Sequence, residues 1–495
     1  MRTAGCTRST SSFLRAALLL ALAACGGGGG GGGSGGSTVE PVISQQLAYL
    51  KASTPGTNDL FGVALAVSGD GNTMAVGAIG EASNATTIGG NQADNSAPNA
   101  GAVYIFTRSG TTWTQQAYIK ASNAQTVDTF GRSVALSADG STLAVGADGE
   151  DSAVGINGNQ ADNAAPGAGA VYVFTRNVSG VWSQQAYVKG SNTVTNYAFG
   201  TSVALSSDGN TLAAGTLGGN KVYVFTRTSN TWTEQTNFAG SNTQAGDAFG
   251  SAIALSSDGN TLAVAAEFEA GNGSGPGDNS APGAGAAYVF TRNGTSWTQQ
   301  AYIKASNAEA GDQFGNSVAL SSDGNTLAVG APLEDGNATG VGGNESDNSA
   351  SGAGAAYVFT RSGTAWTQQA YVKASNTSLL SDFGISVALS GDGNVLAVGS
   401  DQENGSSSGI NGDQNIRASG GTGAVYMFGR SGTAWTQHVY VKASNPQGQD
   451  FFGVRVALSG DGATLAVGAN GEASGIIGNQ NDNSALKAGA VYLFQ

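Results

Sequence analysis

Cysteine and histidine are almost absent from this chain of 495 residues, which contains two cysteines and one histidine. Cys6 lies in a leader that we expect to be removed, so the mature chain would keep Cys25 alone. A single cysteine forms no disulfide within the chain and leaves no thiol for catalysis or for a metal elsewhere. The one histidine, His438, replaces the second glutamine of a Gln-Gln pair on an expected outer strand, which indicates a solvated residue. The sequence therefore excludes a Ser-His-Asp site elsewhere and a centre with several histidine ligands.

Basic residues are also scarce. The chain has 20 lysines and arginines and 34 aspartates and glutamates, which give a net charge of -14. An acidic chain argues against binding to nucleic acid or to anionic lipid headgroups. It is compatible with cations, polyols or basic proteins as partners. Beyond the leader, no stretch is long and apolar enough to predict a transmembrane helix.

The first 24 residues resemble a secretory leader. Arg2, Arg8 and Arg15 supply positive charge, and residues 16–24 form an apolar run too short to span a bilayer. The run ends Leu-Ala-Ala-Cys25, which resembles a bacterial lipobox, so residues 1–24 are predicted to be a lipoprotein signal peptide and Cys25 its lipidation site. An ordinary cleaved signal followed by a chance cysteine is the alternative. Removing three arginines and no acids takes the net charge from -14 to -17 (-14 - 3).

Residues 25–44 are rich in glycine and serine and are predicted to be a flexible tether between the lipid and a folded body. The membrane partner would be reached through the acyl chains on Cys25. Similar lipoproteins with glycine after the cysteine, here Gly26, tend to go to the outer membrane. We therefore expect a bacterial outer-membrane lipoprotein, with surface exposure left open.

The dipeptide Phe-Gly recurs seven times in the same sequence setting. It begins at Phe61, Phe130, Phe199, Phe249, Phe314, Phe383 and Phe452, at intervals of 69, 69, 50, 65, 69 and 69 residues. A long and nearly fixed period indicates one supersecondary unit stacked on its neighbours, because a single unit cannot bury its own apolar faces.

Each repeat reads as four antiparallel strands. In the second repeat, strands are expected over 133–137, 142–147, 169–176 and 182–189, with an Asp-Gly turn after the first. Four strands repeated seven times predict an all-β fold, a seven-bladed β-propeller over residues 45–495. The last repeat stops after its third strand, and residues 45–53 match 115–122, so an N-terminal strand is expected to complete the last blade. The tryptophans share one repeat position and are expected to pack between blades: Trp113, Trp182, Trp232, Trp297, Trp366 and Trp435.

The pattern FG-x-SVALS-x-DG-x-TLAVGA followed by GAVYVF resembles the FG-GAP repeat of the integrin α-subunit propeller in its bacterial form. The resemblance covers residues 45–495 and implies the same propeller fold. Integrin repeats can carry an Asp-x-Asp-x-Asp-Gly calcium loop between the first two strands. Here that turn holds one acid, as in Asp70-Gly71 and Asp139-Gly140, so those calcium sites are not implied.

Acidic residues recur instead in two other connections, which propeller geometry places on one face. One set lies in the long loop between the second and third strands, and the other lies two residues before each Phe-Gly. The candidate metal ligands are Asp59, Glu81, Asp94, Asp128, Glu150, Asp151, Asp162, Asp247, Glu269, Asp278, Asp312, Glu334, Asp335, Asp347, Asp450, Glu472 and Asp482. In repeat three the loop is short and Tyr197 replaces the aspartate, and in repeat six the acid moves to Asp382. The two sets are lost together, which predicts direct contact between the two loops through hydrogen bonds or a shared ion.

Two interpretations of these acids stay open. The carboxylates could accept backbone N–H groups and hold glycine-rich loops in place. Alternatively, several oxygen ligands in each blade could bind Ca²⁺ as a cofactor.

The sequence favours a binding or adhesion module that meets an unknown protein or glycan with its long-loop face. A structural scaffold of the outer membrane is the second hypothesis. A glycan-active enzyme that uses a carboxylate pair is the third, and we expect no enzyme because no pair differs from its repeated copies.

Overall fold

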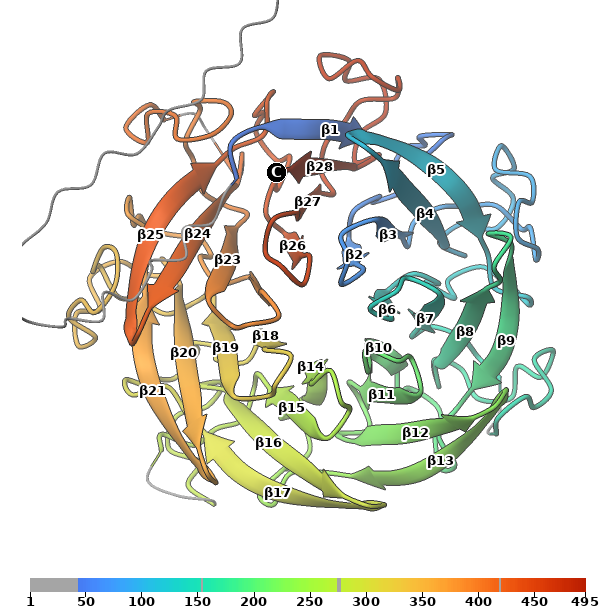
Figure 1. Ribbon diagram of the computed structural model, residues 1–495, viewed down its shortest axis with the longest axis horizontal. Coiled ribbons are helices and arrows are strands. Elements are labelled where there is room, and N and C mark those ends of the chain that lie inside the picture. The colour runs from blue at the N-terminus through green and yellow to red at the C-terminus, as the bar shows by residue number, and fades with distance from the viewer. Residues whose placement is uncertain (1–42, 153–154, 274–276, 418–419) are drawn as a thin grey trace, which may run out of the picture. The chain divides into compact units, whose positions relative to one another are not determined.

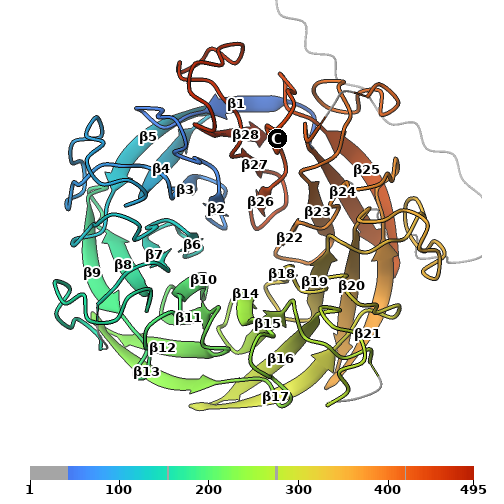
Figure 2. The ribbon, with the colours of Figure 1, turned by 180° about the vertical axis from the view of Figure 1, so that it is seen from behind.

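The computed structural model describes residues 43–495 except 153–154, 274–276 and 418–419. These residues form seven antiparallel sheets of four strands, arranged as blades around a central axis (Figures 1 and 2). The prediction of an all-β, seven-bladed propeller is confirmed. The predicted signal peptide, Cys25 and the tether up to residue 42 lie outside the described residues. The described residues contain no helix long and apolar enough to cross a membrane.

The blades are numbered in chain order, and the strands of each blade are given in order from the axis outward. Blades 1 to 3 contain β2 (Ala64–Val67), β3 (Thr73–Ala78), β4 (Ala102–Ser109), β5 (Thr112–Ile119); β6 (Ser133–Leu136), β7 (Thr142–Ala147), β8 (Ala170–Arg176), β9 (Trp182–Val188); and β10 (Phe199–Leu205), β11 (Thr211–Thr216), β12 (Val222–Thr228), β13 (Thr231–Phe238). Blades 4 to 6 contain β14 (Phe249–Leu255), β15 (Thr261–Ala266), β16 (Ala286–Asn293), β17 (Ser296–Ile303); β18 (Ser317–Leu320), β19 (Thr326–Ala331), β20 (Ala355–Ser362), β21 (Ala365–Val372); and β22 (Ser386–Leu389), β23 (Val395–Ser400), β24 (Ala424–Ser431), β25 (Ala434–Val441). Blade 7 contains β26 (Arg455–Leu458), β27 (Leu465–Ala469), β28 (Ala490–Phe494) and, as its outer strand, β1 (Gln46–Leu50).

The Phe-Gly dipeptide is where one blade packs against the preceding blade. Phe130 is fully buried among apolar residues of blades 1 and 2, and its ring lies 5.3 Å from that of Tyr172 in an edge-to-face contact. Gly131 has a positive φ of 95°, and a Cβ there would lie 2.6 Å from the carbonyl oxygen of Ala102 in blade 1. Only glycine allows this conformation and this approach without strain. The dipeptide therefore joins an apolar wedge to a close backbone contact.

The tryptophans join neighbouring blades at the outer rim. The indole of Trp182 is buried in a cluster shared by blades 1 and 2, and its Nε1 donates to Oε1 of Gln116 in blade 1 at 3.2 Å. Gln116 is the extra residue of a β-bulge between β4 and β5, and the bulge leaves it without a partner on β4. The guanidinium of Arg176 lies 5.6 Å from the indole centroid, within cation–π distance. The prediction that the tryptophans pack between blades is confirmed.

The N-terminal strand closes the ring. β1 pairs antiparallel with β28, with Tyr49 opposite Tyr492, and completes blade 7 as predicted. Arg108 of blade 1 donates to the side chains of Thr464 and Gln495, each at 3.3 Å. Both ends of the described chain therefore meet in one blade, and no outer edge of β28 is left unpaired.

Candidate functional site on the long-loop face

Two kinds of connection share one face of the ring. The loops between the second and third strands of each blade, and those that link one blade to the next, lie on the side that we call the long-loop face (Figure 2). The short turns lie on the opposite side, the turn face. Because strands alternate in direction within each blade, every chain reversal of one kind lies on the same side.

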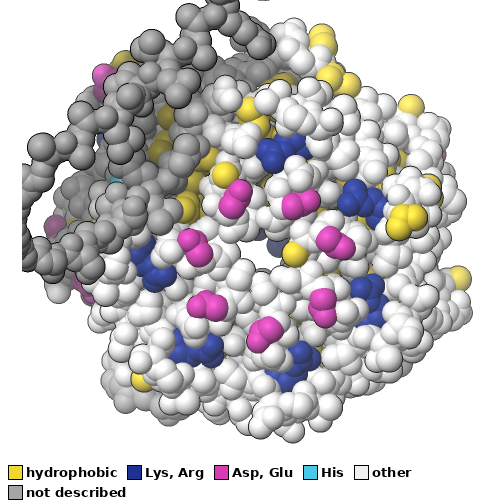
Figure 3. Space-filling view, viewed as in Figure 1, with side chains coloured by type: hydrophobic (Ala, Val, Ile, Leu, Met, Phe, Trp, Pro, Cys, Tyr) yellow, Lys and Arg dark blue, Asp and Glu magenta, His cyan; other side chains and the backbone are white. Residues whose placement is uncertain are grey.

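The turn face carries a ring of acids around the central opening, with basic side chains farther out (Figure 3). The ring consists of the Asp-Gly turn aspartates Asp70, Asp139, Asp208, Asp258, Asp323, Asp392 and Asp461. In the case of Asp139, partial burial raises the pKa, but hydrogen bonds from Ser137 and Ser141 outweigh it and lower the pKa below its usual value. These carboxylates are already bound by the turns that present them.

On the long-loop face, a buried glutamate begins the long loop in six blades. Glu150 accepts Lys189 Nζ at 2.9 Å, Tyr187 Oη at 2.8 Å and the backbone N–H of Ser152 at 3.0 Å. Its side chain is 1% exposed and that of Lys189 is fully buried. We call this arrangement the glutamate–lysine staple, because it fixes the start of the long loop to the end of the outer strand. The six staples pair Glu81 with Lys120, Glu150 with Lys189, Glu269 with Lys304, Glu334 with Lys373, Glu403 with Lys442 and Glu472 with Lys51, at 2.6–3.0 Å.

The staple also reaches the preceding blade. Asn123, which follows the outer strand of blade 1, donates to Glu150 at 3.0 Å and accepts Tyr172 Oη at 2.5 Å. The same double contact recurs at Asn242, Asn307 and Asn376. One carboxylate thus holds its own loop, its outer strand and the neighbouring blade.

Blade 3 lacks the staple: its glutamate, lysine and tyrosine are missing together, although Asn192 still accepts Tyr223 Oη at 2.5 Å. The glutamate position is Gly219, the lysine position is Ala239 and the tyrosine position is Asn237. This joint loss is expected when the members act on one another, because a buried charge without its partner is strongly unfavourable.

The aspartates before Phe-Gly bind the backbone of their own loops. Asp128 is 4% exposed and accepts the N–H of Gln125 at 2.8 Å. The pKa of Asp128 is raised to about 7, chiefly by burial and also by the nearby carboxylates of Glu150 and Asp151, against the lowering effect of that hydrogen bond. Burial likewise raises the pKa to about 7 for Asp312 and Asp450 and to about 6 for Asp59.

The predicted direct contact between the two loops is confirmed. The loops meet through the backbone, where the N–H of Gly80 donates to the carbonyl oxygen of Asp59 at 3.1 Å. A Cβ on Gly80 would lie 1.8 Å from the carbonyl oxygen of Asn58, so the approach requires glycine. Each glutamate takes lysine as its partner because the ammonium neutralises its charge, which a second carboxylate cannot do.

The remaining candidate acids form turns within the long loops. Asp151 accepts the N–H of Gly167 at 2.8 Å, and Asp335 accepts the N–H of Gly352 at 2.8 Å. The carboxylates nearer the loop tips each accept a backbone N–H of their own loop, and all but Asp482 do so from the residue two positions later, in the manner of Asx turns. These are Asp94, Asp162, Asp278, Asp347 and Asp482. Asp247, with its raised pKa caused chiefly by burial, binds the N–H of Gln244 at 2.7 Å.

Calcium does not fit the carboxylates in this arrangement. Calcium takes six to eight oxygen ligands, whereas the glutamate oxygens are occupied by an ammonium group and neutral donors. Within the described ranges, no three His, Cys, Asp or Glu side chains are grouped so that they could hold a metal ion. The geometry favours the interpretation of the acids as loop staples, and calcium binding stays a prediction to be tested in solution.

Sequence reasoning missed two parts of this site. Glu403 of blade 6 was not among the candidates, because the divergence of its loop drew attention to Asp382. The six lysines were missed although each stands in the motif Tyr-x-Lys at the end of an outer strand. Their absence from repeat three, together with the glutamate, was the signal that could have identified the pairs.

Large apolar side chains are exposed mostly on the long-loop face. Of the exposed large apolar residues in the described ranges, only Val178 and Val181 lie on the turn face. The others are Val127, Val194, Leu217, Phe268, Leu333, Leu379, Leu380, Ile416, Ile476, Ile477 and Leu486, all in long loops or inter-blade connections. Leu217, Phe268 and Leu333 follow the second strands of three consecutive blades, so an arc of apolar side chains lies over blades 3 to 5.

Comparison with known proteins identifies the repeats. The FG-GAP repeat family matches residues 113–174, 232–290, 297–359 and 435–494. A search of curated proteins returned no match. Similar solved structures include a candidate 6-phosphogluconolactonase from Bacteroides fragilis NCTC 9343 (14% identity, 80% of this chain, 86% of that chain, TM-score 0.47) and hydrazine synthase from Kuenenia stuttgartiensis (12%, 85%, 94%, 0.46). Likeness at this level carries no inference about activity. The chain is a seven-bladed β-propeller that contains FG-GAP repeats.

Proposed function

We propose that this propeller is a lipid-anchored binding module that holds a partner protein on its long-loop face. The observation that carries the proposal is the concentration of exposed apolar side chains on that face, including the arc of Leu217, Phe268 and Leu333 over blades 3 to 5. Exposed apolar surface in a folded protein is typical of interaction sites. The rigid ring beneath would hold the loops in place for binding, which lowers the entropy lost on association.

The partner that fits this face is a protein with apolar side chains surrounded by basic ones. Partly exposed carboxylates such as Asp94 in blade 1 and Asp347 in blade 5 stand in the long loops of the same face, and the chain as a whole is acidic. Complementary charge would guide the encounter and select basic partners, while apolar contact would supply most of the affinity.

Site-specific photo-crosslinking tests the proposal in the cell that produces the protein. A photoreactive residue is placed at Phe268 or Leu333, and matched controls carry it at Val178 or Val181 on the turn face. One partner band crosslinked from both long-loop positions and from neither control supports the proposal. Equal labelling from both faces, or no discrete product from either, would refute it and favour the scaffold hypothesis.

Attachment through a lipid on Cys25 in the outer membrane is the cellular part of the proposal. It rests on the signal-like leader, the Leu-Ala-Ala-Cys25 sequence and the glycine-rich tether. Labelling with a fatty-acid analogue followed by membrane fractionation tests it. Wild-type protein should carry label in the outer-membrane fraction, and Cys25→Ser should carry none. Labelled Cys25→Ser protein would contradict this assignment.

A further inference from the structure

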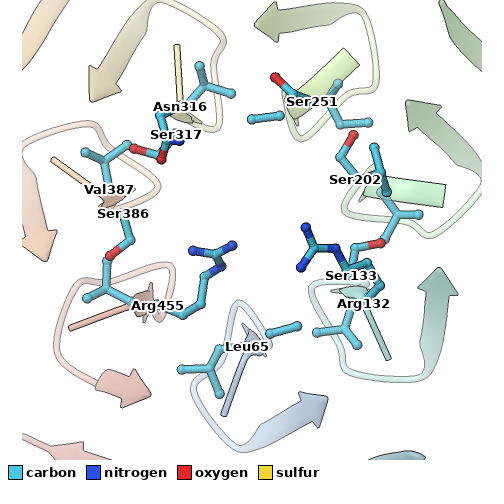
Figure 4. Close-up of a pocket in the computed structure, with 18 of the residues that line it drawn as sticks. Leu65, Arg132, Ser133, Ser202, Ser251, Asn316, Ser317, Ser386, Val387 and Arg455 are labelled. Atoms are coloured by element: carbon cyan, nitrogen blue, oxygen red, sulfur yellow. The ribbon is translucent and has the colours of Figure 1, made fainter. Parts of the chain in front are cut away.

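The innermost strands surround a central cavity of about 250 Å³, which is lined by residues from all seven blades. The residues that line the cavity come from equivalent positions of the seven blades, and two of them are arginines. Arg132 of blade 2 and Arg455 of blade 7 both extend into the central opening, from the two blades that flank blade 1 (Figure 4). The proximity of Arg132 lowers the pKa of Arg455, as does burial, which is the larger cause.

Arg132 stands at a position that varies among the blades, whereas Arg455 breaks the repeat at a position that is otherwise well kept. The residue after Phe-Gly is Val63, Arg132, Thr201, Ser251, Asn316, Ile385 or Val454, and the next is Ala64, Ser133, Ser202, Ala252, Ser317, Ser386 or Arg455. At the second position the blades otherwise use alanine or serine. Each of these serines donates to a backbone carbonyl of the following blade, as Ser133 does to Gly200 at 2.7 Å. Arg455 gives up this structural hydrogen bond, so its presence is not explained by blade packing.

Arg132 has a carboxylate partner in the described residues, whereas Arg455 has none. Arg132 has an ion pair with Asp148, at 3.4 Å between Nε and Oδ2, and both side chains are partly exposed. In the part of the chain that the structure describes, no carboxylate lies within 4.0 Å of Arg455, whose Nη1 donates to the carbonyl oxygen of Val454 at 2.8 Å. A guanidinium has five N–H donors, so most of the donors of Arg455 remain available.

Glu267 and Asp401 lie near these arginines, and Asp382 lies near Asp401, but none of the three forms an ion pair with them in the described residues. Glu267 accepts Asn316 Nδ2 at 2.8 Å, and burial raises its pKa although both arginines lower it. Burial, assisted by the nearby Asp382, raises the pKa of Asp401 to about 7, so that it is partly protonated near neutral pH. Burial also raises the pKa of Asp382, to about 6. The two guanidinium groups are therefore the fixed charges that face the cavity most directly.

We propose that the central channel holds a small oxyanion, a phosphate or carboxylate group, between the side chains of Arg132 and Arg455. Guanidinium groups bind both kinds of oxyanion through paired N–H donors, and two that face one cavity repel each other until an anion lies between them. The hydroxyl of Ser251 lines the same cavity across the opening from the two arginines (Figure 4), and it is buried with no hydrogen-bond partner in the described residues. The cavity volume admits a small anionic molecule but no polymer.

The repeat itself supplies substitutions that should fold. Arg455→Ser restores the residue found in four other blades and provides a donor for the carbonyl oxygen of Gly62, which occupies the place of Gly200. Arg132→Thr copies the residue at the same position of blade 3. Lys487→Gln removes one exposed positive charge from the long-loop face and serves as the matched control for net charge.

Calorimetric titration with inorganic phosphate and, separately, with acetate tests the proposal on the purified protein. We expect one anion per chain for at least one probe, and the probe that binds identifies the phosphate or the carboxylate as the ligand group. Arg455→Ser and Arg132→Thr should each weaken that binding about tenfold or more, while Lys487→Gln leaves it unchanged. The melting temperature of Arg455→Ser should not fall, which separates lost binding from lost folding. Absence of binding with both probes at millimolar concentration, or undiminished binding in the two arginine variants, would overturn the proposal. The outcome is independent of partner crosslinking on the long-loop face.

Discussion

Trp113 shows how one residue at ring closure departs from the pattern of the other blades. Each of the other five tryptophans donates its Nε1 to a glutamine at the bulge of the preceding blade. The corresponding residue before Trp113 is Leu47 of β1, and the buried Nε1 of Trp113 has no partner in the described residues. A buried donor without an acceptor lowers stability by about 1–3 kcal/mol.

We expect Leu47→Gln to raise the free energy of unfolding by about 1 kcal/mol, because the new amide oxygen can accept Trp113 Nε1. Denaturant unfolding followed by tryptophan fluorescence measures the change. Gln116→Leu, which removes the acceptor of Trp182, is the matched control and should destabilise by a similar amount. A loss of stability in Leu47→Gln would show that the apolar contacts of Leu47 matter more than the missing hydrogen bond.

The staple predicts a second effect at single residues. Lys189→Met leaves the carboxylate of Glu150 buried without its ammonium partner, and we expect a loss of about 3–5 kcal/mol. The double variant Glu150→Gln, Lys189→Met removes both charges and should recover most of that loss, since blade 3 is built without either. Unfolding midpoints of the two variants give the comparison. If the double variant were as unstable as the single one, repulsion of an unpaired charge could not be the cause.

The strands could be predicted from sequence almost to their ends, because the same alternation of apolar residues and turn residues occurs in seven repeats. The expected strand over 142–147 is β7, and that over 182–189 ends one residue earlier in β9. The partners of the acids could not be predicted in the same way. Loop conformation is set by contacts between segments distant in sequence, such as Lys51 and Glu472, which are 421 positions apart. A pattern of acids alone does not reveal that the neighbouring cation is a lysine of an outer strand.

At the scale of the element, β1 is the strand on which closure depends. A variant that lacks residues 43–51 should expose the outer edge of β28 and leave Glu472 without Lys51. Unpaired strand edges recruit other chains, so we expect oligomers or aggregates by size-exclusion chromatography with light scattering. A synthetic peptide of residues 43–54 should restore the monomer, and a scrambled peptide should not. A monomeric and fully stable truncated protein would show that blade 7 does not need its fourth strand.

For the whole molecule, the staples predict how the propeller responds to calcium. The carboxylate oxygens of the long-loop face already bind lysine, tyrosine, asparagine or backbone donors, so stability should not depend on a bound ion. We expect no heat on titration with calcium chloride and the same melting temperature with and without chelator. Stoichiometric binding of five or six ions, lost together with stability in chelator, would restore the calcium interpretation.

The buried aspartates before Phe-Gly determine how the whole ring responds to pH. Burial raises the pKa of Asp128, Asp312 and Asp450 to about 7 in the folded protein, against 3.8 for the unfolded chain. The folded state therefore binds more protons than the unfolded state between these values, and stability falls as pH rises through that window. Below about pH 4 the trend reverses, because the lowered pKa values of turn aspartates such as Asp139 stabilise the fold only while those groups are ionised.

We therefore expect a higher melting temperature at about pH 5 than at about pH 8, measured by circular dichroism in buffers of equal ionic strength. The variant Asp128→Asn, Asp312→Asn, Asp450→Asn keeps the acceptor oxygens but cannot ionise, and its melting temperature should change less over the same range. The three sites lie in blades 2, 5 and 7, so their contributions should add. A wild-type melting temperature that rises toward pH 8 would mean that these carboxylates are ionised in the folded ring, and that a positive charge or a bound cation compensates them.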